Sequence, residues 1–272
     1  MTISEDAITV QELQVLGTRA RIYEGGTGTA VLLVHGGWTG AAITWSRVWE
    51  PLAARYRVIA PDLPGLGLPE TPARRSVQQY AVWLVALLDV LGIERAVCVG
   101  NSFGASVASS LAGRAPERCA GLVLVNGFAM PRTPLPLLWL GRTRPGAALM
   151  RALLRRLSFN PEALNRAFVD PSKIPPGLRE MLAPGDSPAL ARFAEILVAG
   201  DGPPPPAVAP LILWGRGDRL PGTGEADARR IHASLPGSTL RLIAGAGHFP
   251  QIEAPEAFLE HLEAFMGSLR IV

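Results

Sequence analysis

The chain has 272 residues, of which 48% are hydrophobic and 18% are charged. This composition excludes an intrinsically disordered chain, because such chains bury too little apolar surface to offset the entropy lost on folding. The formal net charge of +3 is too small to indicate a nucleic-acid partner. The length predicts one sizeable domain with room for an inserted segment.

Neither the apolar segments nor the N-terminal residues of the sequence indicate a membrane protein. No apolar run reaches the roughly 18 residues that span a bilayer, and the first six residues, MTISED, carry acids where a secretory signal would carry bases. We therefore expect a soluble, cytoplasmic protein without stable membrane insertion. Cys98 and Cys119 are too few for a disulfide framework, and we expect both to be reduced packing residues. The sequence leaves open whether the protein is a monomer or a homodimer.

Short apolar segments alternate with longer amphipathic ones along most of the chain. An antiparallel pair is expected at Ile8–Val15 and Thr18–Tyr23. Buried strands are expected at Ala30–Val34, Arg57–Ala60, Ala96–Val99, Leu122–Val125, Leu211–Trp214 and Leu240–Ile243. Helices are expected at Trp45–Arg55, Val77–Leu91, Ser102–Arg114, Glu225–Leu235 and Pro255–Leu269. This alternation predicts an α/β fold with a mainly parallel eight-stranded sheet and helices on both faces.

Residues 129 to 206 interrupt the alternation. They contain 14 of the 25 prolines, including Pro203–Pro206, together with helical periodicity such as that over Ala147–Leu157. Because proline lacks an N–H group and has a fixed φ, this segment cannot continue the sheet. We predict that 129–206 forms a helical cap inserted into a core made of residues 1–128 and 207–272.

The strongest motif lies in the sequence VCVGNSFGAS at 97–106, which is typical of a strand, a sharp turn and a helix. In Gly100-x-Ser102-x-Gly104, the two glycines would let the chain turn tightly enough to expose the serine above the sheet. At the start of a helix, Ser102 would also lie where negative charge is favoured. A serine that only caps the helix is the alternative, but this context favours a nucleophile.

A serine nucleophile needs a base to take its proton. Among the four histidines, His232 and His261 fall within helical patterns and are expected at the solvated surface. His35 ends a buried strand, where we expect it to hold a loop. His248 lies in a glycine-rich loop after the last strand, at the carboxyl edge where such sheets bind ligands, and is the candidate base.

The base in turn needs an orienting carboxylate. Asp218 lies just past the carboxyl end of the strand before His248, although it could be only a turn residue. The order Ser102, Asp218, His248 favours a catalytic triad. The rival acid position, after the sixth strand, holds Asn126 and Gly127, neither of which is an acid.

Acyl transfer also requires hydrogen-bond donors for the oxyanion. We expect one donor to be the Phe103 amide and the second to come from the loop after the first buried strand, with Gly37 preferred and Trp38 as the alternative. Further residues are expected to contact the substrate: Asn101, Phe128, Trp139 and Phe249. The sequence contains no metal-ligand cluster, phosphate-binding loop or Gly-x-Gly-x-x-Gly motif, so neither a metal nor a cofactor is expected.

Taken together, five segments resemble the α/β-hydrolase superfamily. They are His35–Gly37, Pro61–Gly67, Gly100–Gly104, Trp214–Asp218 and Gly247–His248. The resemblance implies an α/β-hydrolase fold from about Val31 to Phe265 outside the cap, with the nucleophile, acid and base assigned above. The chain departs from the family pattern at Pro69, where members commonly carry serine.

These features predict a serine hydrolase that cleaves an ester, lactone or similar small, largely apolar carbonyl substrate. Asn101 and Gln251–Glu253 also resemble enzymes that cleave carbon–carbon bonds in meta-ring-fission products, which are vinylogous diketone acids. Those enzymes usually have a Gly-Ser-Gly-Pro loop where this chain has Gly36–Thr39, and Trp where it has Phe249. A receptor or non-hydrolytic catalyst that keeps the triad is a third alternative. Ten basic against six acidic residues in 129–206 are compatible with an anionic substrate.

Overall fold

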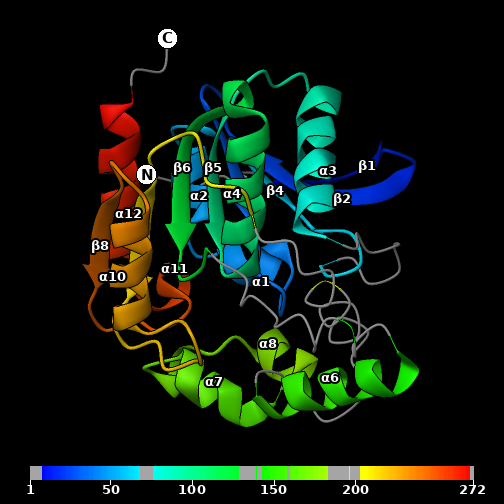
Figure 1. Ribbon diagram of the computed structural model, residues 1–272. Coiled ribbons are helices and arrows are strands. Elements are labelled where there is room, and N and C mark those ends of the chain that lie inside the picture. Colours follow the sequence, from blue (N-terminus) through cyan, green and yellow to red (C-terminus); the bar gives the residue numbers. More distant parts are fainter. Residues whose placement is uncertain are drawn as a thin grey trace.

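The computed structural model describes residues 8–67, 76–128, 139, 143–157, 160–182, 196 and 203–269. Its centre is an eight-stranded sheet in the order β1-β2-β4-β3-β5-β6-β7-β8 (Figure 1). The strands are β1 (Thr9–Val15), β2 (Thr18–Gly25), β3 (Ala30–Val34), β4 (Arg57–Pro61), β5 (Ala96–Asn101), β6 (Cys119–Val125), β7 (Leu211–Gly215) and β8 (Thr239–Ile243). Among these described strands, β1 with β2 and β2 with β4 pair antiparallel, and all other neighbours pair parallel. The predicted mainly parallel sheet is confirmed.

Helices cover both faces of this sheet. Successive residues of β3 alternate between two apolar clusters, with Leu32 and Val34 in one and Val31 and Leu33 in the other. The first cluster includes residues of α3 (Val77–Val90), α4 (Phe103–Arg114) and α10 (Glu225–Ser234). The second includes residues of α1 (Ala41–Trp45), α2 (Trp49–Ala53) and α12 (Pro255–Ser268). A strand that is apolar at every position can therefore bury both of its faces.

The helix predicted over Trp45–Arg55 is wrong, because the chain forms the two short helices α1 and α2 instead. Between them Val48 has φ −126° and ψ −19°, outside the helical region, and its N–H group donates to the Trp45 carbonyl at 2.9 Å. Trp45, Val48 and Leu52 are nevertheless all buried. All three side chains belong to the same apolar cluster as residues of the central strands. The apolar periodicity therefore continues across the break, and this periodicity predicted a single helix.

Between β6 and β7 the chain leaves the sheet, and the described residues of 129–206 form helices and no strand. They are α6 (Arg144–Leu157), α7 (Pro161–Ala167), the short 3₁₀ helix η2 (Pro171–Lys173) and α8 (Pro176–Met181), here called the inserted helices. Figure 1 shows them below the sheet, at the end to which the β6 arrow points. Proline occupies the first helical position of α7, η2 and α8, where its missing N–H group costs no hydrogen bond.

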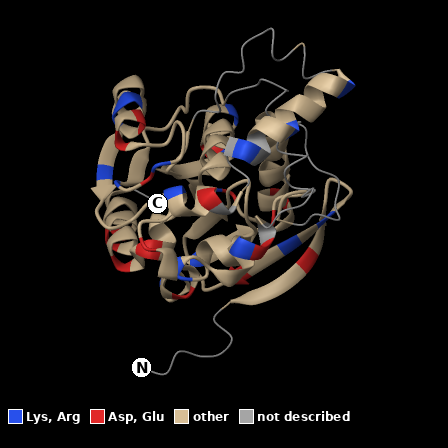
Figure 2. Cartoon of the chain, turned by 90° about the horizontal axis from the view of Figure 1, so that it is seen from below, with Lys and Arg blue, Asp and Glu red and all other residues tan. Residues whose placement is uncertain are grey.

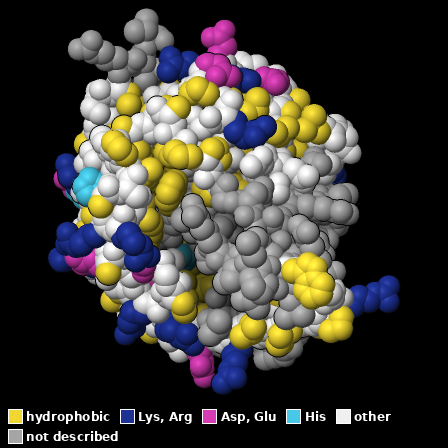
Figure 3. Space-filling model, viewed as in Figure 1, with side chains coloured by type: hydrophobic (Ala, Val, Ile, Leu, Met, Phe, Trp, Pro, Cys, Tyr) yellow, Lys and Arg dark blue, Asp and Glu magenta, His cyan; other side chains and the backbone are white. Residues whose placement is uncertain are grey.

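The surface carries mixed charge and some exposed apolar side chains. Figure 2 shows basic and acidic residues interspersed along the described ribbon rather than gathered in one field. Leu149 and Leu153 of α6 and the isolated Trp139 are exposed, and Figure 3 shows hydrophobic and basic side chains next to each other over the inserted helices. No helix in the described part of the chain is both long and apolar enough to cross a bilayer.

Candidate active site

Ser102 lies in the sharp turn between β5 and α4. Its φ of 55° and ψ of −118° are values that side-chain-bearing residues seldom adopt. Two glycines make the turn sterically feasible: a Cβ atom on Gly100 would lie 2.2 Å from the Gly104 carbonyl oxygen, and one on Gly104 would lie 2.2 Å from that of Val34. The Gly100-x-Ser102-x-Gly104 pattern therefore forms the expected strained turn, with a half-buried serine at its apex.

Asp218 and His248 form a buried hydrogen-bonded pair beside the same edge of the sheet. Nδ1 of His248 lies 2.7 Å from Oδ2 of Asp218, and the two side chains are 4% and 0% exposed. Asp218 follows β7, and His248 follows β8, so these distant positions meet because parallel strands end at the same edge. With Nδ1–H donating to the carboxylate, Nε2 is the nitrogen that can accept a proton.

Asn126 holds Asp218, a role that the sequence reasoning missed. Its Nδ2 donates to Oδ2 of Asp218 at 2.9 Å, and its Oδ1 accepts from the N–H group of Gly215 at 2.9 Å. The other carboxylate oxygen, Oδ1, accepts from the Leu220 N–H group at 3.0 Å. The only signal in the sequence was the rival acid position after β6, where an amide can donate to a carboxylate and an acid could only repel it.

Asn101 connects the serine turn to the histidine loop. Its Nδ2 donates to the carbonyl oxygens of Val125, at 3.2 Å, and His248, at 3.1 Å. The side chain is fully buried. The two hydrogen bonds join the chain around Ser102 to the His248 loop, and the expected contact of Asn101 with the substrate stays a prediction.

His35 fixes the loop after β3 in the structural role expected of it. Nδ1–H donates to the Gly36 carbonyl at 2.7 Å, and Nε2 accepts from the Leu63 N–H group at 2.8 Å. This arrangement requires the neutral imidazole. Burial lowers the pKa of His35, and the neighbouring Asp62 carboxylate offsets only part of that effect. The loop passes close to the serine, because a Cβ atom on Gly36 would lie 3.3 Å from that of Ser102.

The aromatic residues predicted at the site differ in their placement. The ring of Trp38 lies 6.0 Å from that of His248 and 6.3 Å from that of Phe249, measured between centroids. Phe103, the first residue of α4, is buried with its ring edge-on to Tyr80. Both Trp38 and Phe249 belong to an apolar cluster shared with the inserted helices.

Two further residues expected to contact the substrate, Phe128 and Trp139, are not members of the apolar cluster that contains Trp38 and Phe249. Phe128 is partly buried against the cluster that contains α3 and α4, and its carbonyl oxygen accepts from Oγ of Ser106 at 2.8 Å. Trp139 is 72% exposed. The substrate contacts expected of Phe128 and Trp139 stay predictions. The remaining oxyanion candidate, Gly37, is buried in the loop after His35.

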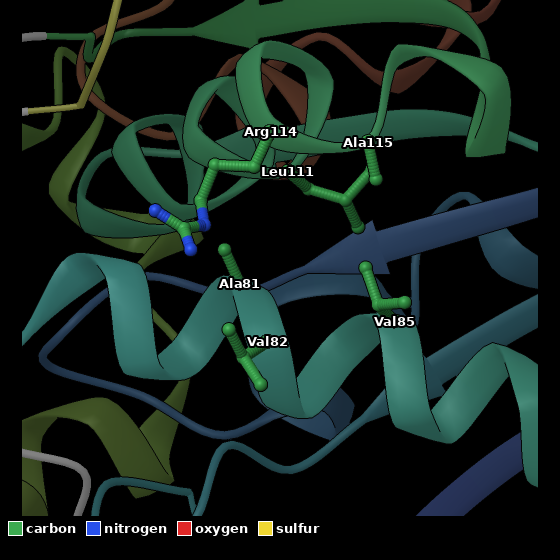
Figure 4. A pocket seen from close by; sticks show the side chains of 6 residues that line it. All are labelled: Ala81, Val82, Val85, Leu111, Arg114 and Ala115. Atoms are coloured by element: carbon green, nitrogen blue, oxygen red, sulfur yellow. The ribbon is translucent and has the colours of Figure 1, made fainter.

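A separate hollow of about 190 Å³ lies between α3 and α4 (Figure 4). Its lining residues are Ala81, Val82, Val85, Leu111, Arg114 and Ala115. Arg114 is the last residue of α4, whereas Ser102 immediately precedes the first. The hollow and the serine turn are therefore at opposite ends of this helix.

The sequence matches the model of the alpha/beta hydrolase family over residues 31–261. This protein belongs to that family. Among curated proteins, the chain is 30% identical to a 2-hydroxymuconate semialdehyde hydrolase of Pseudomonas sp. strain CF600, over 94% of this chain and 93% of that protein. It is 32% identical to an uncharacterized protein of Mycobacterium tuberculosis, over 95% of this chain and 81% of that protein.

Solved structures have the same fold at lower identity. A thermophilic esterase from Thermogutta terrifontis is 23% identical, with a TM-score of 0.72, covering 95% of this chain and 98% of that one. A meta-cleavage product hydrolase from Pseudomonas fluorescens IP01 is 24% identical, with a TM-score of 0.69, covering 96% and 98% of the two chains. The α/β-hydrolase fold expected from the motifs is thus confirmed.

Because His35 is buried and neutral, we expect the free energy of unfolding to depend on pH. In the unfolded chain its imidazole binds a proton near the ordinary pKa of about 6.5, whereas the folded protein resists that proton. Stability is therefore fully present above this value and falls as the pH drops from about 6.5 toward the lowered pKa of the folded state, by at most about 1.4 kcal/mol per pH unit. Urea denaturation between pH 7.5 and 5.5 measures the slope.

The matched variants are His35→Gln and His232→Gln, the latter at an exposed histidine. His35→Gln should lower the free energy of unfolding at pH 7.5 by about 1–3 kcal/mol, because it disturbs two buried hydrogen bonds, and should flatten the acid slope. His232→Gln should keep the slope. An unchanged slope in His35→Gln would contradict the neutral, buried imidazole.

Proposed function

We propose that this protein is a serine hydrolase in which Ser102 is the nucleophile, His248 the general base and Asp218 the carboxylate that orients the base. The observation that carries the proposal is the buried 2.7 Å hydrogen bond between His248 Nδ1 and Asp218 Oδ2. Asn101, which directly precedes the serine of the strained turn, donates to the His248 carbonyl and so joins that turn to the histidine loop. This arrangement provides the base with a defined tautomer and the nucleophile with a helix N-terminus.

In the proposed reaction, Nε2 of His248 takes the hydroxyl proton of Ser102 while Oγ attacks the substrate carbonyl. The oxyanion accepts hydrogen bonds from the Phe103 amide and from the amide of Gly37 or Trp38. His248 then protonates the leaving group, and an acyl-enzyme remains. Water activated by the same histidine releases the acid and restores Ser102.

The surroundings favour a small and largely apolar carbonyl substrate, such as an ester or a lactone. The cluster beside His248 is built from Trp38, Phe168 and Phe249, with Leu164 and Leu178 from the inserted helices. We propose that residues 129–206 act as a cap over the serine. Such a cap excludes water and strengthens the polar interactions within the site.

Carbon–carbon bond hydrolysis of a vinylogous diketone acid is the second candidate, and the curated relatives favour it specifically. Two proteins named 2-hydroxymuconate semialdehyde hydrolase are 30% and 32% identical to this chain. Asn101 before the serine and Gln251–Glu253 after the histidine support the same class. The loop Gly36–Thr39 and Phe249 differ from the pattern expected of that class.

The nucleophile assignment predicts that Ser102→Ala abolishes turnover of p-nitrophenyl butyrate while the fold is kept. The small side chain of a half-buried serine contributes little packing, whereas loss of a triad member costs many orders of magnitude in kcat. Stopped-flow absorbance should show a burst of p-nitrophenol in the native enzyme and none in the variant. Activity of Ser102→Ala within about tenfold of the native value, with unchanged circular dichroism, would contradict the assignment.

The orienting role predicts that Asp218→Asn lowers kcat by up to about 10⁴-fold while the fold is kept. An amide at this position donates toward Nδ1, so it favours the histidine tautomer with the proton on the wrong nitrogen. Steady-state kinetics with the same ester measure the effect. Asp89→Asn, at a mostly exposed aspartate of α3, is the charge-matched control. A nearly silent Asp218→Asn would show that another carboxylate orients His248.

The two candidate substrate classes predict different responses to arginine substitutions in α6. Arg144, Arg151 and Arg156 are exposed, so their individual replacement by alanine should be silent on a neutral aryl ester. If the substrate is an anionic dienoate, at least one of these variants should raise KM for a 2-hydroxy-6-oxo-dienoate by tenfold or more, which is about 1.4 kcal/mol. Unchanged KM values for both substrates in all three variants would contradict recognition of the anion by these arginines.

A further inference from the structure

Glu253 is a buried carboxylate that the proposed reaction does not use. It ends α11 (Pro250–Glu253), five residues after His248, and is 2% exposed. Its two oxygens accept from three main-chain N–H groups. Oε2 accepts from Gly247 at 2.6 Å, and Oε1 accepts from Val169 at 2.8 Å and from Asp170 at 3.0 Å. One oxygen therefore binds the loop of the proposed base, and the other binds the chain between α7 and η2.

The three N–H groups that donate to the Glu253 carboxylate lie outside α11, so these hydrogen bonds do not serve to hold that helix together. Burial raises the pKa of Glu253, and the three N–H groups counteract that rise only in part. A charged group is thus kept in surroundings that disfavour its charge. Among side chains of this length, only the carboxylate of glutamate has two terminal oxygens that both accept hydrogen bonds and no group that donates one. That property is required to accept N–H groups from two separate segments.

Other contacts join the same two segments. The His248 N–H group donates to the carbonyl of Ala167, the last residue of α7, at 2.6 Å. Nζ of Lys173 donates to the main-chain carbonyl of Glu253 at 2.6 Å. The rings of Phe168 and Phe249 stack with centroids 5.2 Å apart. The main chain on both sides of His248 is consequently fastened to the chain that runs from α7 to η2.

We propose that Glu253 is a positioning residue for His248, and this inference rests on the proposed function of that histidine. Asp218 holds the imidazole ring through Nδ1, and Glu253 holds the main chain through the amide of Gly247. The carboxylate thereby makes the placement of the base relative to Ser102 depend on the chain next to α7. A small displacement of a reacting group is costly, since about 1 Å can reduce a rate by about 100-fold.

Glu253→Gln tests this role with little change in side-chain volume. Its single amide oxygen can still accept from Val169 and Asp170, but its NH₂ group then faces the N–H group of Gly247, donor against donor. Glu253→Asp keeps two acceptor oxygens but is one methylene shorter, so it cannot reach both segments. The control is Glu260→Gln, which removes the same charge from an exposed position of α12.

Kinetics are measured with p-nitrophenyl butyrate at a temperature where circular dichroism shows each variant fully folded. Glu253→Gln should lower kcat by about 10- to 100-fold with KM within about threefold, because the base is displaced and the pocket is kept. Glu253→Asp should also lower kcat, and Glu260→Gln should match the native enzyme. A native kcat in fully folded Glu253→Gln would overturn the proposal, since a purely structural role lowers only the melting temperature.

Two spectroscopic measurements need no turnover and therefore separate this inference from the proposed function. Amide hydrogen exchange at Gly247 should become faster in Glu253→Gln, while exchange in β5 stays unchanged. The Nδ1–H proton resonance of His248 should shift or broaden in Glu253→Gln and stay in place in Glu260→Gln. If both readouts are unchanged, the proposal is overturned, whatever the substrate. If they change while the Ser102→Ala variant retains activity, the proposed reaction fails and the positioning of His248 by Glu253 stands.

Discussion

The close approach of main-chain segments at the carboxyl ends of the central strands is the constraint on which the site depends. A Cβ atom on Gly104 would lie 2.2 Å from the Val34 carbonyl oxygen, one on Gly127 would lie 2.4 Å from that of Ser102, and one on Gly215 would lie 2.0 Å from that of Gly247. No side chain fits in such gaps. Glycine at these positions lets β3, β5, β6, β7 and the histidine loop converge on a small volume.

Within that volume, charged and polar groups are held by partners of matching chemistry. The carboxylate of Asp218 accepts from the His248 ring, from the Asn126 amide and from the main-chain N–H group of Leu220. Asn101 in turn holds the His248 carbonyl. A buried carboxylate is tolerated because its hydrogen bonds are made. The arrangement restricts the histidine to one tautomer and one orientation, which are the properties that general-base chemistry requires.

The inserted helices are integrated with the core through the same loop that carries the histidine. Ala167, Phe168 and Leu178 share an apolar cluster with Trp38 and Phe249, and Glu253 adds two hydrogen bonds to this contact, from the N–H groups of Val169 and Asp170. The apolar cluster and the loop of His248 are thus parts of one packed unit. In the proposed reaction, the residues that would face the substrate and the base therefore share contacts.

The sequence by itself determined the sheet, the strained turn at Ser102 and the identity of the paired Asp218 and His248. Strand and helix periods, paired glycines and the order of residues after successive strands are local signals, and parallel strands bring their carboxyl ends to one edge. The tertiary structure alone decided the roles of Asn126 and Glu253, the break between α1 and α2, and the exposure of Trp139. Hydrogen bonds such as Asn126 to Asp218 join residues 92 positions apart. Their partners depend on strand register and on packing between distant segments, and no local pattern in the chain encodes either.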